Sequence, residues 1–290
     1  MIGREAPYLV MPVWLSRFEA QRILGARGLA SVRVSLDLGM KKADVALGPD
    51  GVSFEEGRVT TWTDLEKIVE AERKCFLLND GTFEEIRLFS EHTGWVRSLC
   101  PTSGAPTMLV SGIPMHRIKR TEPWADTRAK LETVAPVKGR ALDTATGLGY
   151  SAIQLSRTAS EVVTIELDPT AIEIARLNPW SRPLFESPKI MQIVGDAYDE
   201  VTKFPERYFS TVFHDPPTIQ LAGELYSQAF YGQLRRVLAS HGKVFHYIGD
   251  PESAHGKKVT SGVIRRLHDA GFSKVERCPE AFGVLAFGFA

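Results

Sequence analysis

The sequence is poor in cysteine and has no long apolar run. Three cysteines occur in 290 residues, at positions 75, 100 and 278, and no two of them form a Cys-x-x-Cys pair. This scarcity argues against a zinc site or a disulfide framework, and it favours a reducing, cytoplasmic environment. No segment approaches the roughly 18 apolar residues that a membrane span needs, and the N-terminus lacks the pattern of a signal peptide. We therefore expect neither a metal site nor a membrane segment.

An excess of charge of one sign is absent as well. The 35 basic side chains balance the 35 acidic ones, so no global field would draw the protein onto nucleic acid. Any contact with a nucleic acid must then use a local basic patch. Asparagine occurs only twice, a scarcity that fits a thermophile but that GC-rich coding could also produce.

A glycine-rich turn organises the second half of the chain. An apolar run ends at Asp143, small residues recur at positions 145, 147 and 149, and a helix-like segment follows over 150–156. Glycine permits a sharp turn and the close approach of a ligand, and a helix start presents free N–H groups. The acidic residue stands before the glycines, an order that suits S-adenosylmethionine better than a pyrophosphate. A turn of purely structural use is the alternative.

Acidic residues also follow three later apolar segments. Glu166, Asp196 and Asp215 each come at or just after the end of such a segment. Glu166 lies 166 − 143 = 23 residues after Asp143, near the spacing of an acidic ribose hook. Because parallel strands end at one edge of a sheet, we expect these carboxylates to lie close together. Asp196 could accept a hydrogen bond from an adenine amino group.

These four strand ends resemble those of the class I S-adenosylmethionine-dependent methyltransferases, over about residues 120–290. The resemblance implies an α/β fold with a doubly wound, mostly parallel, Rossmann-like sheet of seven strands. We place this catalytic domain at 113–290, after a small β-rich domain at 1–112 that would bind substrate or form a homodimer. With S-adenosyl-L-methionine as cofactor, the implied binding residues are Asp143, Ala145, Gly147, Gly149, Tyr150, Ser151, Glu166, Leu167, Asp196 and Ala197.

Hydrophobic periodicity predicts the elements of both domains. The expected helices lie at 14–28, 65–73 (capped at 63 or 64), 124–133, 150–156, 171–177, 222–239 and 262–270. The expected strands lie at 32–38, 43–47, 52–54, 57–62, 75–78, 83–89, 95–100, 107–111, 139–142, 161–166, 190–197, 210–214, 244–248, 274–278 and 282–289.

The segment Asp215-Pro216-Pro217-Thr218 resembles the (Asn/Asp/Ser)-Pro-Pro-aromatic motif of methyltransferases that modify planar exocyclic amino groups. Asp215 and the carbonyl of Pro216 can accept the two amine hydrogens and so expose the nitrogen lone pair. Pro216 and Pro217 fix φ and lack N–H donors, which keeps those carbonyls available to a ligand. We therefore assign the catalytic role to Asp215, Pro216 and Pro217.

Thr218 departs from that motif, because a threonine cannot stack on a base. Three aromatic residues could take that part: Trp124, Tyr150 and Tyr247. We expect substrate contacts from Thr218 and from His116, Arg117 and Lys119, which lie in the link before the glycine turn. A solvated basic connector is the alternative for that link.

The whole chain also resembles archaeal predicted methyltransferases, including the type that modifies N4 of cytidine in ribosomal RNA. The first hypothesis is therefore methylation of an exocyclic amino group of an RNA base, with ribosomal RNA as partner. The second is a polyamine aminopropyltransferase similar to spermidine synthases, or a small-molecule amine methyltransferase. Spermidine synthases place a small β domain before the same core, and their fourth strand ends in an acidic segment without Pro-Pro. A binding or scaffold protein without activity is the third.

Overall fold

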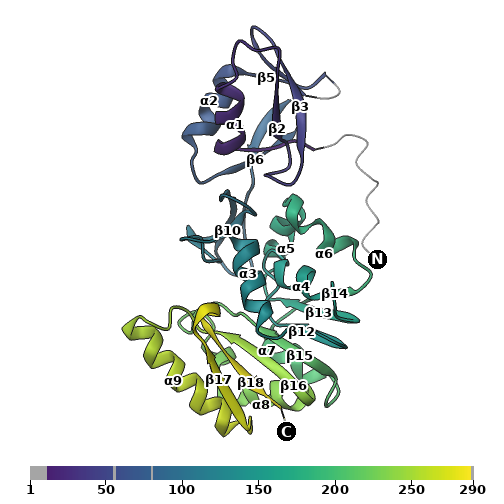
Figure 1. The fold of residues 1–290 in the computed structure, drawn as a ribbon, viewed down its shortest axis with the longest axis vertical. Helices are drawn as coiled ribbons and strands as arrows, with labels where there is room; N and C mark the ends of the chain where they lie inside the picture. Colours follow the sequence, from purple (N-terminus) through teal and green to yellow (C-terminus); the bar gives the residue numbers. More distant parts are fainter. Residues whose placement is uncertain (1–11, 55–56, 80, 289–290) are drawn as a thin grey trace.

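The computed structural model describes residues 12–54, 57–79 and 81–288. Within them, three small sheets precede one large sheet along the chain (Figure 1). The turn residue Asp80, the first eleven residues and Phe289 at the end of the last predicted strand lie outside the described residues.

The large sheet has seven strands in the order β14-β13-β12-β15-β16-β18-β17. Neighbours pair in parallel except for β18, which is antiparallel to β16 and β17. This arrangement confirms the predicted Rossmann-like fold. The strand order reverses between β12 and β15, and doubly wound sheets bind ligands at the carboxyl ends of strands at such a reversal. The strands are β12 (Arg140–Asp143), β13 (Glu161–Glu166), β14 (Ile190–Val194), β15 (Phe209–His214), β16 (Leu238–Tyr247), β17 (Lys274–Cys278) and β18 (Gly283–Phe287).

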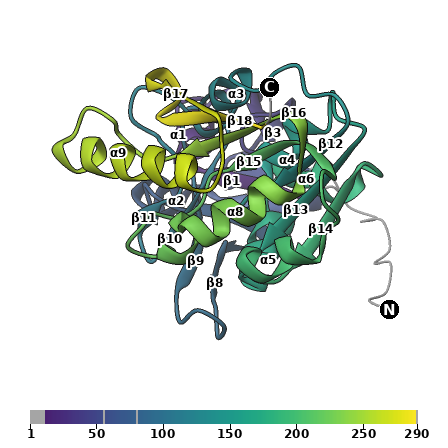
Figure 2. The same ribbon diagram turned by 90° about the horizontal axis from the view of Figure 1, so that it is seen from below.

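Both faces of this sheet are buried. Successive residues of a strand point to opposite sides of the sheet, and in the central strands the residues on both sides are buried. Ala141 and Val162 belong to one apolar cluster, while the next residues, Leu142 and Val163, belong to another. Full burial of such a side chain contributes about 1.5–3 kcal/mol. Figure 2 shows α8 and α9 across one face. The helices of this half are α3 (Pro123–Glu132), α4 (Tyr150–Leu155), α5 (Pro169–Arg176), α6 (Arg182–Glu186), α7 (Ala197–Glu200), α8 (Gln228–Val237) and α9 (Ala254–Asp269).

The N-terminal region is β-rich, as predicted. Its sheets have the orders β2-β3-β4-β5, β1-β6-β7 and β11-β10-β9-β8. The third sheet packs on helices of the C-terminal half, since Leu99 and Met108 share a cluster with Tyr150 of α4 and β8 and β9 contact α5. The domain boundary at residue 112 stays a prediction. The elements are β1 (Trp14–Ser16), α1 (Arg17–Leu24), β2 (Ser31–Ser35), β3 (Lys42–Leu47), β4 (Gly51–Ser53), β5 (Val59–Thr61), α2 (Trp62–Glu70), β6 (Cys75–Asn79), β7 (Thr82–Glu85), β8 (Arg87–Phe89), β9 (Val96–Cys100), β10 (Thr107–Val110) and β11 (Ile113–Pro114).

Two predicted helix starts in this region were wrong. The helix expected from Trp14 begins at Arg17, because Ser16 forms a capping box with Glu19 and β1 precedes it. The helix expected from residue 65 begins at Trp62, with Thr61 accepting the Asp64 N–H as cap. The strand expected over 83–89 is two strands, β7 and β8, which pair in different sheets.

Two corrections in the C-terminal half come from serine caps and one comes from strand pairing. The helix expected over 222–239 is a short 3-10 turn followed by α8, because Ser227 caps a new start by accepting the Phe230 N–H. Strand β16 begins at Leu238, ahead of the predicted Val244, because Leu238 pairs with Phe209. Helix α9 begins at Ala254, ahead of the predicted residue 262, where Ser253 accepts the Gly256 N–H.

Candidate active site

The glycine turn lies between β12 and α4 in a buried position. Gly147 and Gly149 have φ angles of 52° and 76°, a left-handed conformation that favours glycine. A Cβ atom at Gly147 would collide with the methyl group of Met115, and one at Gly149 would collide with Leu184. Met115, from the link before α3, therefore covers the turn.

Asp143 lies beneath this turn and is fully buried. Its Oδ2 atom accepts hydrogen bonds from Ser151 Oγ at 2.8 Å and Thr164 Oγ1 at 2.9 Å. Its Oδ1 atom has no hydrogen-bond partner within the described part of the chain. Burial raises the pKa of Asp143 to about 7. Asp143 thus ties α4 to β13, and its predicted contact with the methionine end of a cofactor stays a prediction.

Glu166 joins the end of β13 to the same turn. Its carboxylate accepts the N–H groups of Gly147 at 2.8 Å and Asp168 at 3.1 Å, and burial raises its pKa. The Gly195 N–H donates to the Glu166 carbonyl at 2.8 Å, and Asp196 caps α7. The structure therefore brings the ends of β12, β13 and β14 together.

The other predicted cofactor residues differ in exposure. Leu167, directly after Glu166, is 47% exposed and offers an apolar surface to a planar ring. Ala145 is half-buried and Ala197 is buried. Tyr150 is 1% exposed, and its hydroxyl donates to the Pro106 carbonyl at 2.8 Å. Tyr150 is therefore a packed residue in this structure and presents no free face for stacking.

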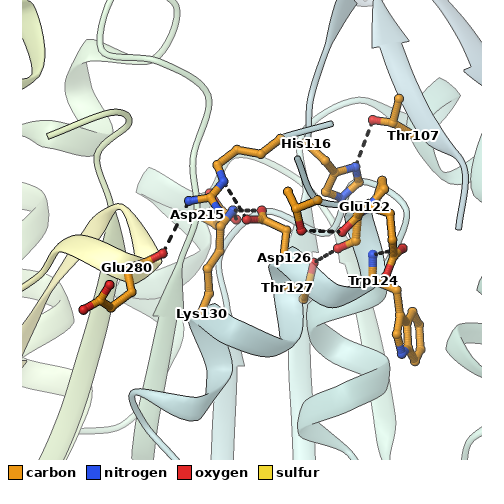
Figure 3. Close-up of polar contacts among 12 residues, drawn as sticks. Thr107, His116, Glu122, Trp124, Asp126, Thr127, Lys130, Asp215 and Glu280 are labelled. Carbon is orange, nitrogen blue, oxygen red and sulfur yellow. Dashed lines mark hydrogen bonds and ion pairs between the residues drawn. The ribbon is translucent and has the colours of Figure 1, made fainter. Parts of the chain in front are cut away.

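A chain of alternating charges leads to Asp215 (Figure 3). Arg117 Nε lies 2.8 Å from Asp126 Oδ1, and Lys130 Nζ lies 3.2 Å from Asp126 Oδ2. Lys130 Nζ also lies 2.7 Å from Asp215 Oδ2. The side chains of Asp126 and Lys130 are 0% and 3% exposed.

Sequence reasoning predicted the helix at 124–133 but did not assign Asp126 or Lys130 to the site. Their signal was the four-residue spacing between an acid and a base, which places both on one side of a helix. An acid and a base at that spacing far more often form a pair on the solvent-exposed face of a helix. Only the burial of both side chains in the folded protein shows that this side faces inward.

Burial and neighbouring charges have opposite effects on the pKa values of these charged residues. Burial raises the pKa of Asp126, with partial compensation from Lys130 and Arg117. Burial alone would lower the pKa of Lys130, but Asp215 and Asp126 outweigh it, so the net direction is upward. Burial also raises the pKa of Tyr247 to about 12. Lys130 is therefore a cation at neutral pH, and Tyr247 is neutral.

A cleft of about 210 Å³ opens beside Pro216. Pro216 is buried and Pro217 is exposed, and the Tyr226 hydroxyl donates to the Pro217 carbonyl at 3.0 Å. None of the described residues that line the cleft is Lys or Arg. They are Pro216, Thr218, Ile219, Gln220, Tyr226, Tyr247, Ile248, Gly249, Asp250, Ser253, Gly256 and Val259. Asp250, which also follows a strand end, was missed in the sequence although it carries the same signal as Asp215.

The histidines near the site are packed. His214 contacts Thr144 Oγ1 at 2.7 Å and the Leu225 carbonyl at 3.0 Å, and burial lowers its pKa to about 3. His116 contacts Thr107 Oγ1 at 3.0 Å and stacks on Tyr150. Burial and then Lys130 lower its pKa to about 3. Of the predicted substrate residues, Thr218 lines the cleft. Arg117 is not part of the lining and pairs with Asp126, and Lys119 is exposed and is not part of the lining either.

The sheet order, the glycine turn and the strand-end acids together define a Rossmann-like fold of the S-adenosylmethionine-related class. No family model matches the chain. The chain belongs to the same family as the uncharacterized protein MJ1233 of Methanocaldococcus jannaschii, to which it is 42% identical over 235 residues, 80% of each chain.

Two further comparisons concern polyamine enzymes. The chain is 29% identical to polyamine aminopropyltransferase 1 of Streptomyces coelicolor over 136 residues, which are 45% of this chain and 25% of that protein. The crystal structure of a spermidine synthase in complex with the transition state analogue AdoDATO has a TM-score of 0.57 and 17% identity, and the match covers 72% of this chain and 76% of that one.

These comparisons support a transferase of the S-adenosylmethionine-related fold class. They give no support to the first hypothesis, methylation of an RNA base, and they favour the aminopropyltransferase alternative. Among the described residues, no helix is long and apolar enough to cross a bilayer.

Proposed function

We propose that this protein transfers an aminopropyl group from decarboxylated S-adenosylmethionine to an aliphatic amine. The observation that carries the proposal is the acceptor cleft beside Asp215, whose described lining contains a carboxylate and aromatic rings but no basic side chain. The aminopropyltransferases among the sequence relatives favour the same chemistry.

The cleft suits a flexible, cationic acceptor. Tyr226 and Tyr247 supply aromatic faces, which attract ammonium groups and pack against methylene chains. Asp250 supplies a carboxylate to that lining, where a second ammonium group of a diamine would be stabilised. A nucleic acid would instead require Lys or Arg to neutralise its phosphates.

The surroundings of the glycine turn suit a donor without a carboxylate. The contacts to turn residues 144–149 include an apolar one, from Met115, and an acidic one, from Glu166. The unpartnered Oδ1 of Asp143 lies below. A donor whose tail ends in an ammonium group fits such a site better than an amino acid tail does. Glu166 would hold the ribose hydroxyls, and Leu167 and Asp196 the adenine.

The reaction needs an oriented nitrogen lone pair. A C–N bond forms as the C–S bond of the donor breaks, the sulfur keeps the electron pair, and the nitrogen loses one proton to solvent. Asp215 would accept a hydrogen bond from the nitrogen and direct its lone pair at the donor. Most of the rate acceleration would then come from positioning.

The test is to identify the nucleoside product. Decarboxylated S-adenosylmethionine with putrescine, cadaverine or spermidine should yield methylthioadenosine and the extended polyamine, both resolved by mass spectrometry. Asp215→Asn is the matched control and should yield neither product. Absence of methylthioadenosine with every amine, in a protein that is folded by circular dichroism, would contradict the proposal.

Methyl transfer to a planar amino group is the second candidate. Its specific support is the Asp215-Pro216-Pro217 sequence, in which Asp215 and the Pro216 carbonyl would accept the amine hydrogens. The Pro217 carbonyl already accepts a hydrogen bond from Tyr226. The same assay distinguishes it, because S-adenosylmethionine with a nucleoside or RNA acceptor would then give S-adenosylhomocysteine.

A further inference from the structure

Lys130 is buried beside the acceptor cleft, although the transfer described above gives it no role. Its side chain is 3% exposed, and its Nζ atom lies 2.7 Å from Asp215 Oδ2. The same atom lies 4.0 Å from the centre of the Tyr247 ring, and Tyr247 lines the cleft. An amine bound to Asp215 would therefore lie close to the charge of Lys130.

The surroundings of Lys130 keep it charged. It faces Asp126 from its own helix, Asp215 after β15, Tyr247 from β16 and His116 from the link before α3. Tyr247 and His116 are neutral near pH 7, since their pKa values are about 12 and about 3. The two carboxylates therefore compensate the ammonium group.

The charge of Asp215 is already balanced. With Arg117 paired to Asp126, the chain of four charges sums to zero, because two cations alternate with two anions. An ammonium group arriving at Asp215 would add an unbalanced cation next to Lys130. A neutral amine would add none, and it could donate a hydrogen bond to Oδ1 while Lys130 holds Oδ2.

We infer that Lys130 is a positioning residue which fixes Asp215 through one oxygen and selects the neutral, nucleophilic form of the reacting amine. This inference rests on the proposed function. An alkylammonium has no lone pair, so it must lose a proton before it attacks, and a nearby like charge favours that loss by about one to three pKa units. The released proton goes to solvent as the amine binds.

The first experiment compares the pH dependence of kcat for wild type, Lys130→Met and Lys130→Arg. In Lys130→Met the ascending limb should move up by about one to two pH units, a loss of about tenfold per unit at neutral pH. Lys130→Arg keeps the charge and should keep the position of the limb. A fall in kcat with an unmoved limb would assign Lys130 a merely structural role and overturn the inference.

Lys130→Met leaves the buried carboxylate of Asp126 with Arg117 alone, so Asp126→Asn combined with Lys130→Met provides a second variant in which residue 126 carries no buried charge. Calorimetry then gives a readout that needs no turnover. Diamine is titrated into protein that holds methylthioadenosine, in buffers of different ionisation enthalpy. Wild type should release about one proton per amine, and the double variant clearly less.

The outcomes separate the two proposals. Proton release by wild type without turnover supports the role of Lys130 and contradicts the proposed aminopropyl transfer. Turnover with equal proton release by wild type and the double variant overturns the role of Lys130 alone. A wild-type protein that neither binds nor converts any amine overturns both.

Discussion

The proposed cofactor half of the site and the proposed acceptor half are built in different ways. In the cofactor half, Asp143 and Glu166 stand at strand ends and accept hydrogen bonds from hydroxyl or backbone N–H groups nearby. In the acceptor half, Asp215 is held by the charged Lys130, which Asp126 holds in turn. The first half repeats one local device along a sheet. The second couples charges from distant segments, so a substitution there should alter several groups at once.

Removal of the acceptor carboxylate should produce the largest effect. Asp215→Ala should reduce turnover by about 10³-fold or more, because the nitrogen loses its only proposed orienting carboxylate. Affinity for methylthioadenosine, measured by calorimetry, should change by less than about threefold. Glu252→Ala is the control, since that side chain is 82% exposed beside the cleft loop. A parallel loss of nucleoside affinity in Asp215→Ala would move Asp215 into the cofactor half.

The corresponding substitution in the cofactor half should have the opposite signature. Glu166→Ala should weaken methylthioadenosine binding by about 10- to 100-fold, or about 1.4–2.8 kcal/mol, because a carboxylate that accepts ribose hydroxyls is removed. Turnover at saturating donor should stay within about threefold. Glu161→Ala, at the other end of β13, is the matched control. Equal affinities for the two variants would remove Glu166 from the site.

Substitution of the covered glycine tests how tightly the link lies on the cofactor turn. Gly147→Ala forces a left-handed φ of 52° on a residue with a Cβ that collides with Met115. We expect a loss of about 1–3 kcal/mol in the free energy of unfolding. Met115→Ala combined with Gly147→Ala should recover the steric part. Gly232→Ala is the control, because a Cβ within α8 has open space there. Urea unfolding that shows no difference between Gly147→Ala and Gly232→Ala would contradict the packing.

The smallest expected effect is on the pH dependence of the free energy of unfolding, to which buried titratable groups in both halves contribute. Burial holds the pKa of His116 and His214 near 3, below the ordinary 6.5. As pH falls below 6.5 the unfolded histidines take up protons that the folded ones do not, so stability falls. Burial raises the pKa of Asp143 to about 7 from 3.8. The contribution of Asp143 to the free energy of unfolding is complete below pH 3.8 and is lost as pH rises through 7. Between those values it grows as pH falls, and so it offsets the loss of stability caused by one histidine.

Asp143→Asn removes that offset. Between pH 6.5 and 5 its free energy of unfolding should fall more steeply than that of wild type, by up to about 1.4 kcal/mol per pH unit. Urea titrations at pH 7, 6 and 5 measure both slopes. Parallel slopes would show that Asp143 carries no proton in this range.

Much of the fold was predictable because its signals are local. β13 was predicted at residues 161–166 and lies there, since a β-branched run between polar ends needs no distant partner to be recognised. Helix starts at Arg17 and Ala254 were not predicted, although each is fixed by a serine cap. Serines are common outside helices, and only the packing of the flanking chain decides which of them becomes a cap.

The candidate site divides in the same way. The sequence by itself determined that the acids of the proposed cofactor half lie together: Asp143, Glu166 and Asp196 follow apolar runs, and parallel strands bring such ends to one edge of a sheet. Only the tertiary structure decided the acceptor half. Lys130 and Asp215 are 85 positions apart, and nothing in either segment shows that they meet. Burial makes their pairing strong, and burial is a property of the packed helix and sheet rather than of any stretch of sequence.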